Sequence, residues 1–175
     1  MVILYFLSLS VFALYIGYIL IRFGVPTSVS ETYYLLPKKT GHLIFWAWTI
    51  AVGLPVMIFG AEISPVSFIS ESSIFFCGAF LIFVGTAAQF KQDFVRNYHF
   101  AFAGICAALS LIWIGFTYIQ GLKIVVILTP ISVLLGAYIP SVNADDKVKR
   151  NSLVFFLELV CFVSLYGAMG LYYWK

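Results

Sequence analysis

The sequence predicts an all-α polytopic membrane protein in which residues 1–175 form a single bundle of six transmembrane helices. Hydrophobic residues make up 63% of the chain and charged residues only 10%, whereas soluble domains are roughly half apolar and a quarter charged. Apolar stretches of about 20 residues, the length that spans a bilayer, recur six times. No domain boundary separates them, since the longest connection between stretches is residues 22–41.

The first two spans are Val2–Ile21 and His42–Gly60. The first lacks a basic segment ahead of it, and Arg22 follows it in place of a small-residue cleavage site. We therefore interpret it as a retained helix and not as a signal peptide. The second contains Pro55, which predicts a kink because proline removes one backbone hydrogen bond.

The third and fourth spans are Ser72–Phe90 and His99–Tyr118. Ser64-Pro65 is typical of a helix N-cap followed by proline at the first helical position, so the third helix can begin earlier. Small side chains fill one surface of the fourth span, which predicts close helix packing and a central position. These small residues are Ala101, Ala103, Gly104, Ala107, Ala108 and Ser110.

The last two spans are Ile124–Pro140, which contains Pro130, and Ser152–Tyr173. Their order fixes which loops share a side of the membrane, and Lys and Arg favour the cytoplasmic side. The loops after the first, third and fifth spans hold Arg22, Lys38, Lys39, Lys91, Arg96, Lys147, Lys149 and Arg150. The other side holds only Lys123 and Lys175. The sequence therefore predicts a multi-pass protein of the cell inner membrane with both termini on the outer, periplasmic side.

Composition also excludes several classes of function. Ten Lys and Arg and seven Asp and Glu cannot cover a water-soluble globule of this size, so a soluble enzyme is not expected. No basic face with interleaved aromatic residues is present, and we predict no nucleic-acid partner. Cys77, Cys106 and Cys161 are scattered in apolar stretches without a CxxC motif, and we interpret them as packing residues.

Glu158 is the main candidate functional residue. It lies about six residues, or roughly 9 Å, inside the last span. An ionisable group at this depth is costly, so it marks a functional site and is expected to face the bundle interior and meet polar partners. Further candidates fall on the same, cytoplasmic side of the membrane. They are His99, Asp93, His42, Ser28, Ser30 and Glu31.

These residues predict a polar pocket, open to the cytoplasm, that binds a lipid or small molecule. Glu158 and His99 would form its inner wall, with residues 28–31 as a lid. The predicted partners are the lipid bilayer and this ligand, and no cofactor is predicted. A proton- or ion-coupled transporter or channel remains an alternative, with Glu71 as a station on the outer side. Such a transporter would be a homo-oligomer, because six short spans enclose little volume.

An intramembrane hydrolase is a third alternative, in which Ser28 or Ser30 acts with His99. No GxSxG motif supports it, so an enzyme is not favoured. His42, His99, Asp93 and Glu158 carry groups that bind metals. No HxxxH or HExxH motif places two of them on one helix face, and we therefore predict no metal site.

The segment from Arg22 to Tyr34, RFGVPTSVSETYY, and the pair Tyr98-His99 resemble a family of small six-helix bacterial and phage membrane proteins. More remotely they are similar to the six-helix DRAM and GPI-anchor-remodelling family, and more weakly to the CREST hydrolases. In the DRAM family the loop after the first helix is luminal, whereas the charge count here places it in the cytoplasm. The resemblance implies the six-helix fold and no activity.

Overall fold

The computed structural model describes residues 2–37, 40–65, 67–87, 93–142 and 152–175, without the side chains of residues 87 and 93–100. Within these ranges the chain is helical, and its one β-bridge joins Pro26 to Val142. The elements are α1 (Val2–Phe23), α2 (Thr32–Leu35), α3 (Gly41–Ile63), α4 (Phe68–Ala87), α5 (Asp93–Thr117), the 3-10 helix η1 (Ile119–Gly121), α6 (Leu122–Tyr138) and α7 (Leu153–Tyr173).

Five of these helices are long and apolar enough to cross a membrane, namely α1, α3, α4, α7 and the segment Ile119–Tyr138 that contains α6. A shorter apolar stretch, Ala101–Thr117, lies within α5. The described part of the chain is therefore a helical bundle of membrane-protein character. The predicted spans agree with the observed helices to within a few residues at most ends, because each apolar run stops where the chain needs polar turn residues.

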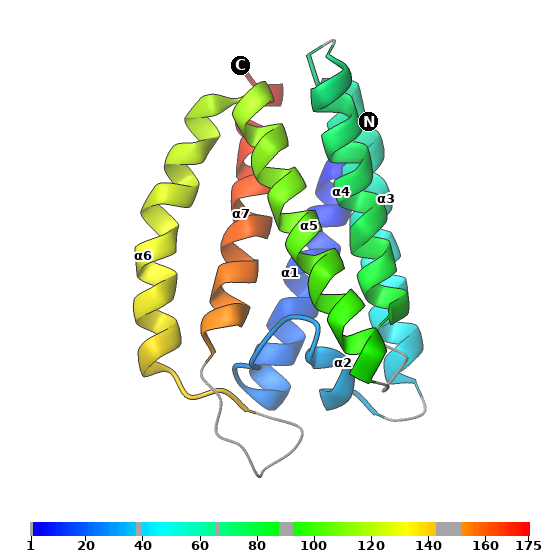
Figure 1. The fold of residues 1–175 in the computed structure, drawn as a ribbon, viewed down its shortest axis with the longest axis vertical. Coiled ribbons are helices and arrows are strands. Elements are labelled where there is room, and N and C mark those ends of the chain that lie inside the picture. The colour runs from blue at the N-terminus through cyan, green and yellow to red at the C-terminus, as the bar shows by residue number, and fades with distance from the viewer. Residues whose placement is uncertain (1, 38–39, 66, 88–92, 143–151) are drawn as a thin grey trace.

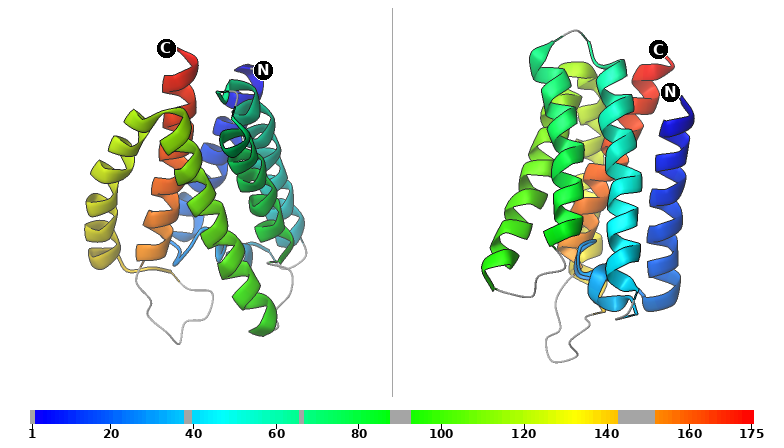
Figure 2. Two further views of the ribbon diagram at one scale, coloured as in Figure 1. Left: turned by 45° about the horizontal axis from the view of Figure 1, so that its top comes forward. Right: turned by 90° about the vertical axis from the view of Figure 1, so that its right-hand side faces the viewer.

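The long helices run alternately up and down, so that α1 begins and α7 ends at the same end of the bundle (Figures 1 and 2). α3 packs on α1 and α4, and α5 packs on α4 and more loosely on α7. α6 packs mainly on α7 and lies at the edge of the bundle in Figure 1. The end of α1, the start of α3, the end of α6 and the start of α7 therefore lie at the end opposite the termini.

Aromatic side chains fill the contact between α1, α3 and α7. Trp48 stacks on Tyr15 with ring centroids 4.6 Å apart, and Phe12 lies 4.8 Å from Phe162. Buried aromatic pairs add to the free energy of packing beyond their buried area. This cluster holds α3 and α7, two of the helices that line the site, against α1.

Two expectations about helix ends are corrected. Ser64 was expected to cap the following helix, but it ends α3, where its hydroxyl group donates to the Gly60 carbonyl at 2.7 Å and accepts the Trp113 indole N–H at 2.7 Å. α4 begins at Phe68, four residues before the predicted Ser72. The short helix α2 was not predicted, because its four residues carry no helical periodicity.

Small residues bring α3 and α4 into close contact. The close packing predicted for the small residues of α5 is not found along its whole length. A Cβ atom at Gly53 of α3 would lie 2.9 Å from the Gly78 carbonyl oxygen of α4, and one at Gly85 would collide with Thr49. At Gly104 of α5, by contrast, an added Cβ would have no heavy atom within 4 Å. The small face of α5 there borders a cavity and not another helix.

The cationic residues that set the predicted orientation are mostly not described. Lys38, Lys39, Lys91, Lys147, Lys149 and Arg150 lie outside the described residues, and the side chain of Arg96 does as well. Arg22 is in the last turn of α1, at the end opposite the termini, and is exposed. The termini lie at one end of the bundle, as the prediction requires.

Candidate functional site

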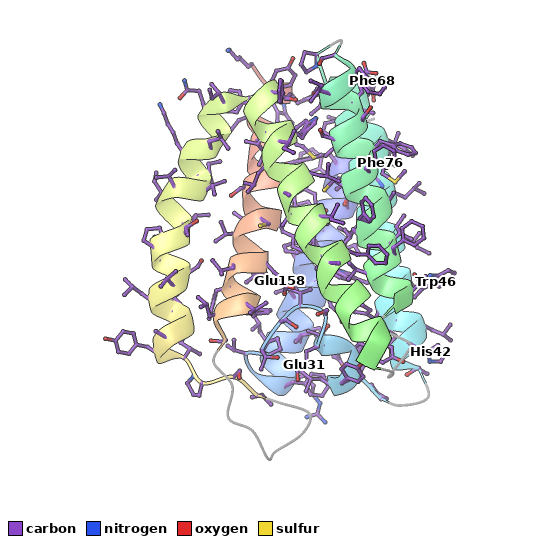
Figure 3. All side chains as sticks on the ribbon, in the orientation of Figure 1. Glu31, His42, Trp46, Phe68, Phe76 and Glu158 are labelled. Carbon is purple, nitrogen blue, oxygen red and sulfur yellow. The ribbon has the colours of Figure 1, made fainter. Side chains whose placement is uncertain are left out.

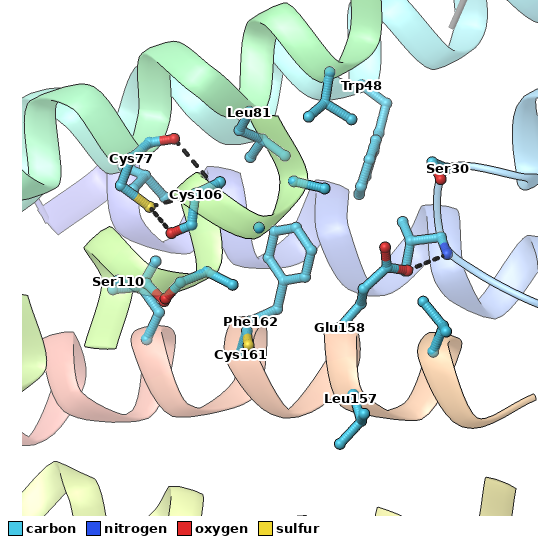
Figure 4. Close-up of a pocket in the computed structure, with 18 of the residues that line it drawn as sticks. Ser30, Trp48, Cys77, Leu81, Cys106, Ser110, Leu157, Glu158, Cys161 and Phe162 are labelled. Carbon is cyan, nitrogen blue, oxygen red and sulfur yellow. Dashed lines mark hydrogen bonds between the residues drawn. The ribbon is translucent and has the colours of Figure 1, made fainter. Parts of the chain in front are cut away.

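A cavity of about 300 Å³ lies between α3, α4, α5, α7 and the first loop (Figure 4). Its walls are mostly apolar. The sequence predicted a polar pocket, and the structure differs in that most of the wall is apolar. The carboxyl group of Glu158 and the hydroxyl group of Ser30 lie near the loop, and three thiols lie elsewhere in the wall. The other lining residues include Phe45, Trp48, Val56, Leu81, Val84, Ala103, Gly104, Ala107, Ser110, Leu157, Phe162 and Leu165.

The first loop reaches the cavity because its backbone is bonded to the start of α7 and to the segment after α6. Gly24 ends α1 with a positive φ of 87°, a conformation that glycine adopts without strain. The Val25 carbonyl then accepts the Val142 N–H at 2.7 Å, and the Thr27 carbonyl accepts the Phe155 N–H at 3.0 Å. The second bond supplies a partner for one of the free N–H groups at the start of α7.

Glu158 points from α7 toward this loop, and its Oε2 accepts the backbone N–H of Val29 at 2.5 Å (Figure 4). The Val29 carbonyl in turn accepts the Thr32 hydroxyl group at 2.6 Å, and that hydroxyl group lies 2.6 Å from the Tyr15 hydroxyl group. Val29 is therefore held through both its N–H and its carbonyl, which belong to consecutive peptide groups. A half-buried carboxylate such as that of Glu158 is stabilised by such a bond, since an isolated charge in an apolar site is costly.

Ser28 and Ser30 lie on either side of Val29. The Ser28 hydroxyl group accepts the Glu31 N–H at 3.1 Å and lies 3.0 Å from the Ser30 hydroxyl group. These bonds form a tight serine turn, which sets the loop conformation. Ser28 is buried in the turn, whereas Ser30 lines the cavity.

The cavity wall away from the loop carries the cysteines. The Cys77 and Cys106 sulfur atoms lie 3.6 Å apart, and each thiol contacts the carbonyl oxygen of the other residue, at 3.4 and 3.3 Å (Figure 4). Cys161 lines the cavity from α7, one helical turn after Glu158. All three cysteines are free thiols.

Trp48 forms part of the wall between these two groups. Its side chain is buried between Tyr15 and Phe162. Within the part of the chain that the structure describes, its indole N–H has no hydrogen-bond acceptor. The indole nitrogen atom is itself fully buried, so this unpaired donor is a free-energy cost within the packed wall.

The structure brings together some of the predicted site residues and separates others. Glu158 and Ser30 line the cavity, and Ser28 and Glu31 belong to the adjoining loop (Figure 3). His42 lies half-buried in the first turn of α3, at the edge of the molecule and away from Glu158 in Figure 3. Glu71 is exposed in the first turn of α4, at the end where the termini lie.

Two candidates cannot be placed by their side chains. Asp93 and His99 lie in the first two turns of α5, and their side chains are outside the described residues. Among the residues whose side chains are described, no group of three or more His, Cys, Asp or Glu is arranged to hold a metal ion.

Sequence reasoning did not predict that three thiols and Trp48 line one cavity, or that the Trp48 indole N–H is unpaired among the described residues. One signal was present, because Cys161 follows Glu158 by three residues and therefore shares its helix face. The pairing of Cys77 with Cys106 had no sequence signal. It depends on which helices are neighbours and on their relative depth, and neither follows from hydropathy.

Comparison of the chain with protein-family models, with curated proteins and with solved structures finds no match. The resemblance of residues 22–34 and 98–99 to six-helix membrane proteins therefore stays a prediction.

Proposed function

We propose that this chain is an integral membrane protein that binds a lipid or another amphipathic small molecule in the cavity. The polar end of the ligand would lie against Glu158 and Ser30, and its apolar part against the helices. The observation that supports this most directly is the carboxyl group of Glu158 in the wall of a cavity that is otherwise mostly apolar. Ionisable groups at membrane depth are retained mainly for function.

The chemistry of the walls defines the class of ligand. Among the residues that the structure describes, Val29 donates a hydrogen bond to Glu158. A ligand amine or hydroxyl group would donate a further bond to the carboxyl group, while an alkyl chain or ring fills the apolar part. The cavity volume of about 300 Å³ is at the lower end of the range of ligand sites. It suits a single chain or ring system and not a two-chain phospholipid.

We further propose that α1, α3, α4, α5, α6 and α7 all cross the bilayer of the cell inner membrane, with both termini on the periplasmic side. α5 has 25 residues, and at ~1.5 Å per residue its length exceeds the roughly 30 Å apolar layer. The common end of the termini supports an even number of spans. The excess of Lys and Arg in the loops at the other end supports its cytoplasmic position. The polar end of the cavity then lies beneath the first loop on the cytoplasmic side.

The arrangement favours binding over conduction of ions. A conduction path would have to join Glu158 to the end of the bundle where Glu71 lies. The described cavity residues on that side of Glu158 are mostly apolar, and their polar groups are the three thiols and the Ser110 hydroxyl group. Ions cross such segments poorly without polar or hydrated partners.

The test measures ligand binding by the purified full-length chain in detergent micelles. Oleylamine and monoolein serve as probes with a donor head group, and thermal unfolding reports their stabilisation of the protein. We expect Glu158→Gln to weaken probe binding about tenfold, the effect of losing one charge-assisted hydrogen bond. Glutamine can still accept the Val29 N–H, so the fold should persist. Glu71→Gln, at the exposed outer end, is the matched control and should bind as the native chain does.

A second variant separates head-group recognition from occupancy of the cavity. Ala107 lines the cavity, and Ala107→Phe would fill part of its volume. We expect this variant to lose binding of both probes, while Ala137→Phe on the exposed face of α6 should have no effect. Unchanged binding by both Glu158→Gln and Ala107→Phe would show that the probes bind elsewhere, and the proposal would then be wrong.

A further inference from the structure

The wall of the cavity also carries a pair of neighbouring thiols, which belong to Cys77 of α4 and Cys106 of α5. Their sulfur atoms are 3.6 Å apart, the distance of two sulfur atoms in contact without a bond. A disulfide requires about 2.05 Å, so a shift of about 1.5 Å, shared between two side chains, would form one. The mutual thiol-to-carbonyl contacts at 3.4 and 3.3 Å show that the two backbones already approach closely.

The position of the pair restricts what can oxidise it. Both cysteines lie near the middle of their helices, α4 (Phe68–Ala87) and α5 (Asp93–Thr117), and both line the apolar cavity. If the helices span a bilayer, water-soluble disulfides such as glutathione disulfide do not reach this depth. An oxidant must then be soluble in lipid, small enough for about 300 Å³ and able to accept two electrons.

We propose that Cys77 and Cys106 are a redox-active dithiol that a lipid-soluble quinone, bound in the cavity, oxidises to a disulfide. The inference rests on the proposed function, because the quinone would be an occupant of the same cavity. The cavity of about 300 Å³, whose mostly apolar wall both thiols help to form, has room for a single quinone ring beside the two sulfur atoms.

The reaction balances without a further reagent. The two S–H bonds break and one S–S bond forms between the sulfur atoms, which together lose two electrons and two protons. The quinone takes up both electrons and both protons and leaves as the hydroquinone. Cys161 lines the cavity from α7 but is not part of the 3.6 Å pair, and it keeps its thiol.

The experiment treats the reduced, purified full-length chain in micelles with duroquinone. All four ring positions of this quinone carry methyl groups, so it does not form thioether adducts with cysteine readily. We expect one hydroquinone per chain, a mass loss of about 2 Da and a peptide that links Cys77 to Cys106. Cys77→Ser and Cys106→Ser should abolish hydroquinone formation, and Cys161→Ser should leave it unchanged. Thermal unfolding of the serine variants verifies that they are folded.

Two outcomes would overturn the inference. One is a native chain that stays fully reduced while its thiols still react with a small alkylating reagent. The other is a disulfide that contains Cys161. The cavity filler Ala107→Phe tests the route, and we expect it to slow oxidation about tenfold, whereas oxidation at the native rate would mean that the quinone does not act from the cavity.

Failure here is distinguishable from failure of the proposed function. If oleylamine or monoolein binds and Glu158→Gln weakens it, while duroquinone leaves the thiols reduced, the cavity is a binding site and the redox assignment is wrong. If duroquinone forms the Cys77–Cys106 disulfide and neither probe binds, the dithiol is correct and the assignment of an amphipathic ligand is wrong.

Discussion

Tyr166 joins α7 to α1 through its hydroxyl group, which lies 2.5 Å from the Ser8 Oγ. Ser8 donates to the Val52 carbonyl of α3 at 3.1 Å, and the Tyr5 hydroxyl group donates to the Tyr166 carbonyl at 3.1 Å. Since Ser8 uses its own proton toward Val52, the Tyr166 hydroxyl group is the donor to Ser8. Three helices thus share one chain of hydrogen bonds in an apolar environment, where each unpaired group would be costly.

Removing this hydroxyl group should destabilise the bundle. We expect Tyr166→Phe to lower the free energy of unfolding by about 0.5–2 kcal/mol, because Ser8 loses its donor while the ring packing is kept. Thermal unfolding in detergent measures the change. Tyr138→Phe, on a residue that is 83% exposed, is the control and should leave the midpoint unchanged. Equal midpoints for the two variants would contradict the assignment.

The sequence alone identified Glu158 as a site residue, but it did not identify the group that binds its carboxylate. Glu158 could be singled out because a carboxyl group inside an apolar stretch is anomalous by itself. The approach of the first loop to Glu158 was also predicted, because the charge count places both on the cytoplasmic side. Its partner there is the backbone N–H of Val29, and a backbone contact of this kind leaves no trace in the side-chain sequence.

The contact between α3 and α4 shows how glycine sets the distance between helices. Gly53 faces Gly78, and a Cβ atom on Gly53 would lie 2.9 Å from the Gly78 carbonyl oxygen and 3.0 Å from Ile82. The neighbour at 2.9 Å is backbone, which cannot rotate away. Small residues are typical of such close contacts, because in lipid the association of helices depends on packing.

A single methyl group at this contact should separate the two helices. We expect Gly53→Ala to lower stability by about 1–3 kcal/mol, the usual cost of overpacking. Gly17→Ala is a matched control, because a Cβ atom there meets no heavy atom within 4 Å. Thermal unfolding of both variants in one detergent makes the comparison. A loss of stability in Gly17→Ala as large as that in Gly53→Ala would show that glycine flexibility, and not the contact, is responsible.

The helices themselves were predictable, because long apolar runs bounded by polar residues specify them directly. Their ends were less so. Ser64 carries a hydroxyl group and precedes Pro65, which is typical of a helix start, yet it ends α3 and accepts a bond from Trp113. That partner comes from α5 and is remote in sequence. Tertiary contacts of this kind decide between two local readings that the sequence leaves equivalent.

Across the whole molecule, the alternating helices place both termini at one end (Figures 1 and 2). The two ends of α3 offer a direct test of which side is which. Thr40, just before α3, and Glu62, near its end, are both exposed. In spheroplasts, we expect a membrane-impermeant maleimide to label Glu62→Cys and to label Thr40→Cys only after permeabilisation.

The unsubstituted chain is the control for this labelling, because its three cysteines lie within helices α4, α5 and α7. Labelling of Thr40→Cys in sealed spheroplasts, with Glu62→Cys protected, would reverse the proposed orientation. Labelling of both positions would show that α3 does not cross the membrane. A pocket beside Glu158 was predicted, but its mostly apolar lining was not, since that lining depends on the small face of α5 having no helix against it.

The first loop is bonded through Val25 to Val142 and through Thr27 to Phe155, so that its backbone is tied to the segment after α6 and to the first turn of α7. Backbone bonds of this kind do not open without local unfolding. For the proposed ligand we therefore expect a route between the helices and through the hydrocarbon, and not past this tethered loop from the aqueous phase. Its occupancy would follow its mole fraction in the surrounding lipid, and dilution of the sample with buffer would not remove it.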